Sequence, residues 1–159
     1  MDLISWLLTI GTALACVGFV LWVVLWRTSA RLSVDQARRL FLQERMRLQR
    51  LFFKFASESG KPRGLLWKDG QWNELLAWAR DKRTGQFLAL AGVTISFEAK
   101  PGSDMEGVEA VGNLRNASAV FFFHDGQWQT VGRAVFNLNP DEVLERFKEN
   151  YERIEPAIS

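Results

Sequence analysis

An uncharged apolar run at the N-terminus constrains this chain more than any other feature. From Leu3 to Trp26 no side chain is charged, and Leu and Val are the commonest of these 24 residues. At about 1.5 Å per helical residue the run reaches roughly 36 Å, enough to cross a hydrocarbon core of about 30 Å. The sequence therefore predicts a transmembrane anchor over residues 1–26, with indole side chains at the membrane interfaces. These are Trp6 at one end and Trp22 and Trp26 at the other.

A cleaved leader is the alternative interpretation of the same run. A signal peptide has basic residues before a shorter apolar stretch, whereas only Asp2 is charged before this one. The tetrad Ala13–Cys16 is similar to a lipoprotein cleavage box, but ten further apolar residues follow it. These features favour a permanent anchor.

The charges that flank the run predict its orientation. Arg27, Arg31, Arg38 and Arg39 all follow it. By the positive-inside rule the N-terminus lies outside and the rest of the chain lies in the cytoplasm. We therefore expect a single-pass protein of the type found in bacterial inner membranes.

Three small residues recur on one face of the predicted membrane helix. Gly11, Ala15 and Gly18 have the spacing that lets a second helix approach closely. Because Gly and Ala are common in all membrane helices, a lipid-facing surface is the alternative.

A strongly basic segment, residues 27–63, connects the predicted anchor to the rest of the chain. Its ten Lys and Arg residues against three acidic ones give a net charge of +7. Such a cluster beside a bilayer attracts anionic lipid head groups, although it also serves simply to fix topology. Nucleic-acid binding is not expected, because no docking motif is present and the following segment has a net charge of −4.

Apolar residues with a helical period predict a helix over residues 34–57 within this basic segment. The predicted apolar stripe comprises Ala37, Phe41, Leu48, Leu51, Phe52 and Phe55. We expect this stripe to pack on the domain that follows, since Glu44 interrupts any coiled-coil seam.

The remaining segment, residues 64–159, has strand-like alternation and predicts an α+β domain. Five strands are expected, joined by turns at Asp69–Gly70 and Asp125–Gly126 and by longer loops. Their ranges are 65–68, 72–80, 86–99, 114–123 and 127–138. A C-terminal helix begins after the cap Asn139. The resulting plan, a helix laid across a five-stranded antiparallel meander, resembles the cystatin-like architecture in the order and type of its elements.

The residues that carry chemistry are scarce. The only cysteine, Cys16, lies in the predicted span, and the only histidine, His124, precedes a hairpin turn. Asp104, Glu106 and Glu109 share a loop, but their spacing fits no EF-hand. No catalytic residue, metal site or cofactor is therefore predicted.

Polar residues within the predicted strands give one candidate patch or pocket. They are Arg115, Asn116, His124, Arg133 and Asn137. The solvent-facing side of a half-covered sheet would place polar residues in the same way.

These observations lead to two hypotheses for function. The first is a non-catalytic, membrane-anchored interaction protein, an accessory or scaffolding subunit of a membrane complex whose partners are the membrane and other protein subunits. The alternative is a small-molecule-binding module or an enzyme that uses a pocket on the curled sheet.

Overall fold

The computed structural model describes residues 19, 22, 34–59 and 62–155. Its contacts divide the chain into two units, residues 1–39 and 40–159. No helix in the described residues is long and apolar enough to cross a membrane. The predicted span lies outside the described part of the chain, apart from Phe19 and Trp22.

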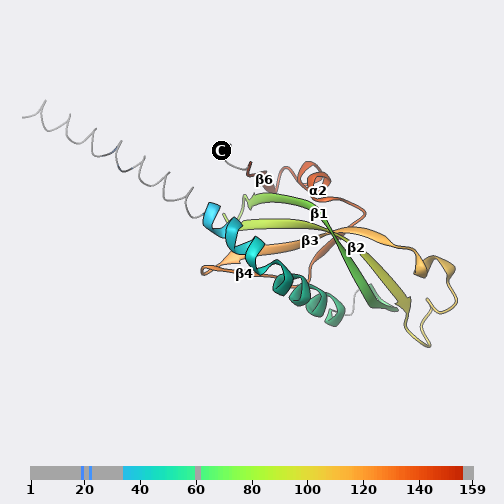
Figure 1. The fold of residues 1–159 in the computed structure, drawn as a ribbon. Helices are drawn as coiled ribbons and strands as arrows, with labels where there is room; N and C mark the ends of the chain where they lie inside the picture. The colour runs from blue at the N-terminus through green and yellow to red at the C-terminus, as the bar shows by residue number, and fades with distance from the viewer. Residues whose placement is uncertain (1–18, 20–21, 23–33, 60–61, 156–159) are drawn as a thin grey trace, which may run out of the picture. The chain divides into compact units, whose positions relative to one another are not determined.

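The second unit is an α+β domain built on a six-stranded antiparallel sheet (Figure 1). The strands are β1 (Leu65–Asp81), β2 (Phe87–Ala99), β3 (Arg115–His124), β4 (Gln127–Gln129), β5 (Ala134–Phe136) and β6 (Tyr151–Arg153). The sheet order is β4-β3-β2-β1-β6, and β5 also pairs with β3. A 3₁₀ helix, η1 (Glu109–Gly112), precedes β3, and the helix α2 (Pro140–Arg146) precedes β6.

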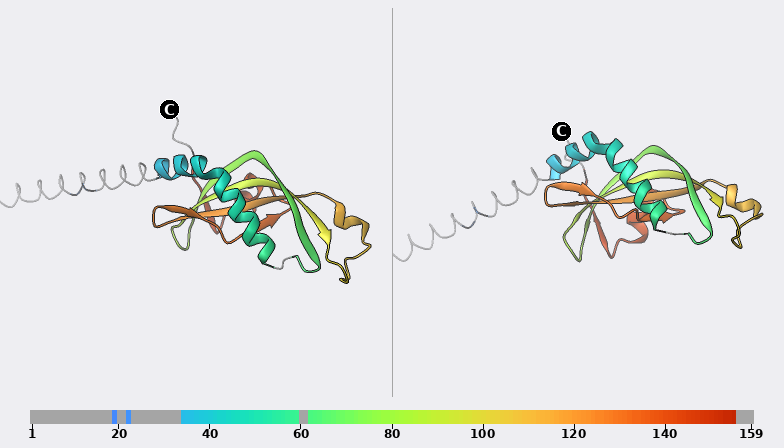
Figure 2. Two further views of the ribbon diagram at one scale, coloured as in Figure 1. Left: turned by 60° about the horizontal axis from the view of Figure 1, so that its bottom comes forward. Right: turned by 90° about the horizontal axis from the view of Figure 1, so that it is seen from below.

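The helix at residues 34–58 lies across one face of the sheet from residue 40 onward (Figure 2). Phe41, Leu48 and Phe52 are buried, as the predicted apolar stripe requires. Phe55 is exposed, and the small Ala56 takes the buried position near the end of the helix. An alanine fits there because the loop at Gly132 approaches the helix backbone: a Cβ on Gly132 would lie 2.2 Å from the backbone nitrogen of Ala56.

Aromatic rings fill the space between this helix and the sheet. Phe41 makes edge contacts with Trp78, Phe121 and Trp128, at centroid distances of 5.4, 5.3 and 5.0 Å. Further along, Phe52 packs on Trp72 at 5.5 Å. Such ring pairs each add about 0.5–1.5 kcal/mol beyond their buried area. Buried rings from the helix and from the strands therefore form the core of this face.

The opposite face of the sheet has an aliphatic core beneath α2. Alternate residues of the strands point there, because successive side chains in a strand face opposite sides. The buried members of this core are Ala77, Ala79, Leu88, Leu90, Val120, Val143 and Leu144. Asn139 caps α2 with a capping box, in which the side chain of Asn139 accepts from the backbone of Glu142 and the backbone of Asn139 donates to the Glu142 carboxylate.

The prediction of five strands is wrong at its first turn. Asp69–Gly70 is not a hairpin turn, because neither residue has a positive φ and both pair with β2 inside the continuous strand β1. The other Asp-Gly pair, Asp125–Gly126, has φ values of 48° and 76° and joins β3 to β4 in two residues. The same dipeptide therefore has two conformations, and the long partner strand β2 accounts for the extended one at Asp69.

Two further differences lie near the C-terminus. The predicted strand 127–138 is divided into β4 and β5, because Gly132 has a φ of 71° and Thr130 turns its hydroxyl onto the Val120 carbonyl at 2.9 Å. The C-terminal helix ends at Arg146, and the chain returns as β6 along the edge of β1. This pairing uses backbone groups of β1 that would otherwise be left at a sheet edge.

Candidate functional site

Three of the five predicted patch residues lie together. Arg115, Asn116 and Asn137 line a groove of about 530 Å³, here named the polar groove, on the face of the sheet that carries α2. Asn73, Asn139 and Glu142 contribute its other polar side chains. The groove thus presents four side-chain amides with one guanidinium and one carboxylate.

Local backbone geometry forms the polar groove. Between the pairs Trp72↔Val93 and Leu76↔Ala91, β1 has extra residues where β2 has only Gly92. This mismatch is a β-bulge in β1. The Asn73 side chain folds over Gly92, where a Cβ would lie 2.1 Å from its Oδ1. Asn73 Oδ1 also accepts from the Leu75 backbone at 3.0 Å. The bulge in β1 and the missing side chain of Gly92 therefore shape this part of the groove.

The polar side chains of the groove are tied to the sheet. Thr94 Oγ1 donates to Asn116 Oδ1 at 3.0 Å, and the Asn137 backbone nitrogen donates to the Asn116 carbonyl at 2.7 Å. Asn137 has a φ of 59°, a left-handed conformation that asparagine tolerates. These bonds hold the side-chain amide of Asn116 and the backbone at Asn137 in place.

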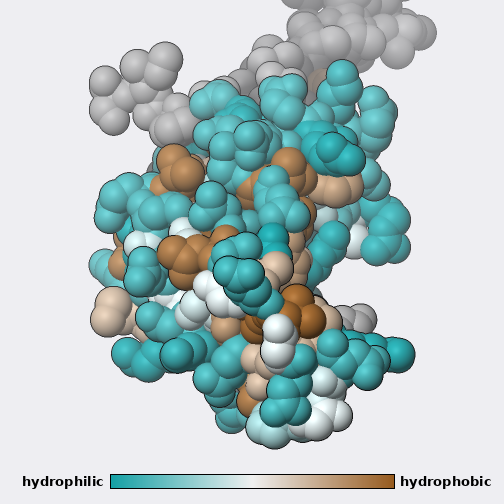
Figure 3. Space-filling model, turned by 90° about the vertical axis from the view of Figure 1, so that its right-hand side faces the viewer, coloured by the Kyte–Doolittle hydropathy of each residue, from teal (hydrophilic) through white to brown (hydrophobic). Residues whose placement is uncertain are grey.

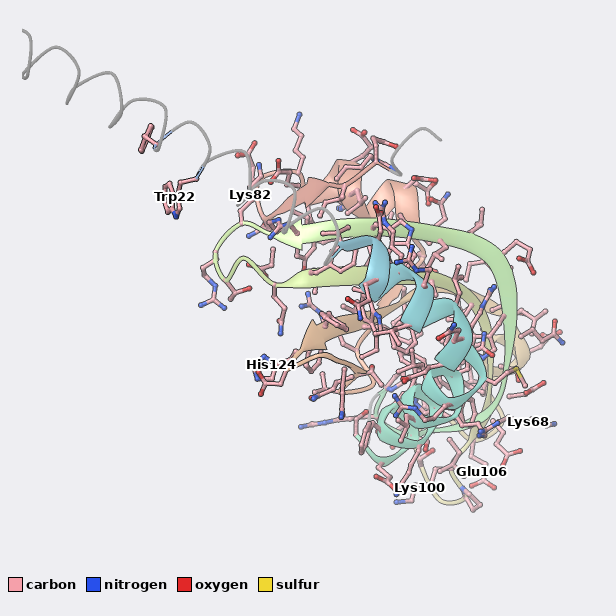
Figure 4. All side chains as sticks on the ribbon, turned by 60° about the vertical axis from the view of Figure 1, so that its left-hand side comes forward. Trp22, Lys68, Lys82, Lys100, Glu106 and His124 are labelled. Carbon is pink, nitrogen blue, oxygen red and sulfur yellow. The ribbon has the colours of Figure 1, made fainter. Side chains whose placement is uncertain are left out.

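His124 and Arg133 lie outside the polar groove. His124 is 60% exposed at the β3–β4 hairpin, with Nε2 3.3 Å from Asp125 Oδ2. It lies at the opposite end of the sheet from Lys68 (Figure 4). Arg133 is exposed in the connection between β4 and β5, where its carbonyl accepts from Val120. Sequence reasoning missed Asn73 and Glu142, because a bulge and a helix cap bring them to the groove.

A smaller, mostly apolar hollow of about 260 Å³ adjoins the loop after β2. Phe97, Met105 and Phe136 line it, and Arg115 and Asn137 lie at its polar side. On the face of the molecule that carries this loop, hydrophobic residues reach the surface in several separate patches (Figure 3).

A third hollow, here named the helix–β1 groove, lies between the long helix and the first half of β1. It measures about 380 Å³, and the helix contributes Met46, Gln49, Arg50, Phe53 and Lys54. The strand contributes Lys68, Asp69, Gly70 and Trp72. Sequence reasoning missed it, because Phe53 and Met46 lie outside the predicted stripe, on the flank of the helix.

The described residues contain no group of three His, Cys, Asp or Glu side chains that could hold a metal ion. The loop acids Asp104, Glu106 and Glu109 are exposed, and Glu106 accepts from the Gly102 backbone at 2.7 Å.

Among the described residues, the carboxyl group of Asp81 has a clearly displaced pKa. The backbone N–H of Thr84 donates to Asp81 and lowers the pKa of that carboxyl below its ordinary value. Partial burial opposes this effect, and a second backbone bond, from Arg83, supports it. Both bonds measure 2.9 Å and fix the β1–β2 hairpin loop. The shift therefore belongs to a structural turn.

The predicted membrane residues are only partly described. Trp6, Trp26, Arg27, Arg31 and the packing triplet Gly11, Ala15 and Gly18 lie outside the described residues. Trp22 is exposed, with its ring 6.0 Å from that of Phe19. Arg38 pairs with Asp35 at 3.4 Å, and Arg39 is exposed.

No protein-family model, curated protein or solved structure matches the chain.

Proposed function

We propose that this chain is a non-catalytic interaction protein, held at the membrane by residues 1–26, whose α+β domain docks a partner on the cytoplasmic face. In this proposal it is an accessory or scaffolding subunit of a membrane complex. The cystatin-like plan remains a proposal about architecture alone.

The helix–β1 groove is the observation that carries this proposal. Met46 is 68% exposed at this groove although it lies on a helix whose other side is fully buried. Exposed apolar side chains with neighbouring arginine are the usual anchors of protein interfaces. The ring-filled core on the helix side of the sheet also disfavours an interior ligand site.

Mild-detergent extraction of the full chain from native membranes, followed by native mass spectrometry, tests this proposal. We expect a species heavier than the monomer that contains a second protein in fixed ratio. A monodisperse monomer under several mild detergents would contradict an accessory-subunit role.

The proposed orientation has its own test. Variants with Cys16→Ser and one new cysteine, at exposed Glu109 or Gln127, are treated in intact cells with an impermeant thiol reagent. We expect labelling only after permeabilisation. Labelling in intact cells would place the domain outside.

The polar groove supports a second candidate, a binding module for a small polar molecule. Its side-chain amides offer donors and acceptors, while Leu75 and Leu114 supply exposed apolar contact. A thermal-shift panel of monosaccharides and dicarboxylates tests it. Stabilisation that is lost in Asn116→Ala would support this candidate, and no stabilisation by any member would count against it.

A further inference from the structure

The outer edge of β1 is only partly covered. β6 pairs with it at Ala79–Asp81. Further toward the start of the strand, the guanidinium of Arg45 donates to the Asn73 carbonyl at 2.6 Å. In the described part of the chain no strand pairs with the outer side of residues 68–72. A strand edge of this kind is a template for another extended chain.

The helix–β1 groove runs beside this uncovered edge. Phe53 forms its floor, since a Cβ added to Gly70 would lie 3.4 Å from the Phe53 ring. Phe53 is itself held by Trp67 at a centroid distance of 5.9 Å. Met46 and Trp72 complete the apolar surface. An added strand would therefore have a firm apolar site for side chains on one of its faces.

The charges around the groove are mostly positive. Arg50, Lys54 and Lys68 are exposed there, against the single acidic residue Asp69. In Figure 4 Lys68 lies at the far end of the sheet from Lys82 and the β1–β2 hairpin. Complementary charge at such a rim selects partners and speeds their encounter.

Asp69 protects the edge when no partner is present. Its Oδ1 accepts from the Gly70 backbone nitrogen at 2.8 Å, so this donor is satisfied within the strand. Pairing between copies of a chain is limited when edge N–H donors already have a partner within their own strand and when the edge carries charged residues. Two copies would also bring like charges together, which disfavours a homodimer at this edge.

We propose that an extended acidic segment of a partner protein binds in the helix–β1 groove as an added strand along residues 68–72. The inference rests on the proposed function and names its docking mode. Backbone bonds to the β1 edge supply affinity, apolar side chains of the segment contact Met46, Phe53 and Trp72, and its carboxylates pair with Lys54 and Lys68.

A strand is favoured over a lipid surface as the occupant. A bilayer offers head groups but no backbone to pair with a strand edge. An acidic segment can pair with the strand edge, contact the apolar groove and pair with the lysines at the same time.

The experiment measures binding of a labelled peptide, Glu-Leu-Glu-Val-Glu-Leu-Glu, to the full chain in nonionic detergent by fluorescence anisotropy. The matching peptide with Lys in place of Glu is the charge control. We expect the acidic peptide to bind at least tenfold more tightly than the basic one. Equal binding of the two peptides would overturn the proposal.

Charge-reversal variants locate the binding. Lys54→Glu with Lys68→Glu is expected to weaken peptide binding at least tenfold. The matched control, Arg83→Glu with Lys148→Glu, makes the same charge change at exposed residues outside the groove and should alter binding less than threefold. Equal weakening in both double variants would contradict the assigned site.

Asp69 gives a test in the opposite direction. Asp69→Ala removes both the repulsive charge and the local partner of the Gly70 N–H, so we expect peptide binding to tighten at least threefold. Weaker binding in this variant would contradict strand addition.

Hydrogen exchange and a lipid competitor complete the test. The peptide should slow exchange of amides in residues 68–72, and exchange unchanged there would overturn the strand geometry. Phosphatidylserine in the micelles should compete weakly; if it binds through Lys54 and Lys68 while the peptide does not, the occupant is a lipid.

A partner that co-purifies equally with the Lys54→Glu/Lys68→Glu variant would refute this groove and leave the proposed function intact.

Discussion

The two faces of the sheet are covered in different ways. On the face of the long helix, buried rings such as Phe52, Phe121 and Trp128 pack between the helix and the sheet. On the other face the short α2 covers only the aliphatic part, and the polar groove lies open beside it. This difference indicates that the face covered by the long helix contributes most of the stability. The polar groove and the helix–β1 groove lie at the borders of the surface that the helices cover.

The largest expected effect comes from removing a ring on the helix face. Phe52→Ala deletes a fully buried side chain that contacts Trp67, Trp72 and Phe121, and should lower the free energy of unfolding by about 4 kcal/mol. Leu144→Ala, on the α2 face, should cost about 2–3 kcal/mol. Denaturant unfolding of the full chain in detergent measures both losses. A larger loss for Leu144→Ala would show that the α2 face contributes more stability than the helix face.

The next effect tests the close approach of the β4–β5 connection to the helix. Gly132→Ala should cost about 3 kcal/mol, because it adds a backbone clash at Ala56 to the strain of a positive φ. Gly85→Ala is the matched control, since Gly85 has nearly the same φ (72° against 71°) with nothing within 4 Å of its Cβ. It should cost only about 1 kcal/mol. Thermal unfolding measures both variants. Similar losses of stability for Gly132→Ala and Gly85→Ala would show that the helix can move away from the added methyl group at residue 132.

A smaller effect is expected from a buried hydroxyl on the α2 face. Ser118 is fully buried, and its Oγ donates to the Leu138 carbonyl at 2.9 Å beside the polar groove. Ser118→Ala should cost about 1–2 kcal/mol, because that carbonyl loses its side-chain donor. Chemical denaturation measures it, and an unchanged stability would mean that water replaces the hydroxyl.

The smallest effect concerns pH and the β1–β2 hairpin. Because the pKa of Asp81 is lowered by the Thr84 N–H, its ionised form stabilises the fold above the pKa of the unfolded chain. That contribution is lost as the pH falls through the lowered pKa of the folded state. Asp81→Ala should therefore cost about 1 kcal/mol at pH 7. The difference from wild type should shrink in the acid limb of a pH–stability profile, and a constant difference would contradict this role.

Local patterns predicted much of the sheet. The alternation of β2, the Asp125–Gly126 hairpin and the Asn139 cap all depend on neighbouring residues, so sequence alone identified them. Asp69–Gly70 was misassigned because a turn dipeptide stays extended when a long partner strand pairs with both residues. β6 was missed because its three residues are a strand only through their pairing with β1.

The candidate sites were less predictable than the fold. Arg115, Asn116 and Asn137 lie together because β5 pairs with β3 after the chain reverses at Asp125–Gly126, whereas His124 and Arg133 lie elsewhere. Asn73 enters the polar groove through a bulge, and the helix–β1 groove depends on how the flank of a helix meets a strand edge. Neither arrangement has a periodic signal in the sequence.

Docking at the helix–β1 groove is best tested by hydrogen exchange of the full chain in native membranes, compared with the purified monomer. We expect slower exchange in the membrane at residues 46–54 and 68–72, around the helix–β1 groove, with little change at residues 115–117. Protection confined to the polar groove around Asn116, or identical exchange in both states, would contradict docking at the helix–β1 groove.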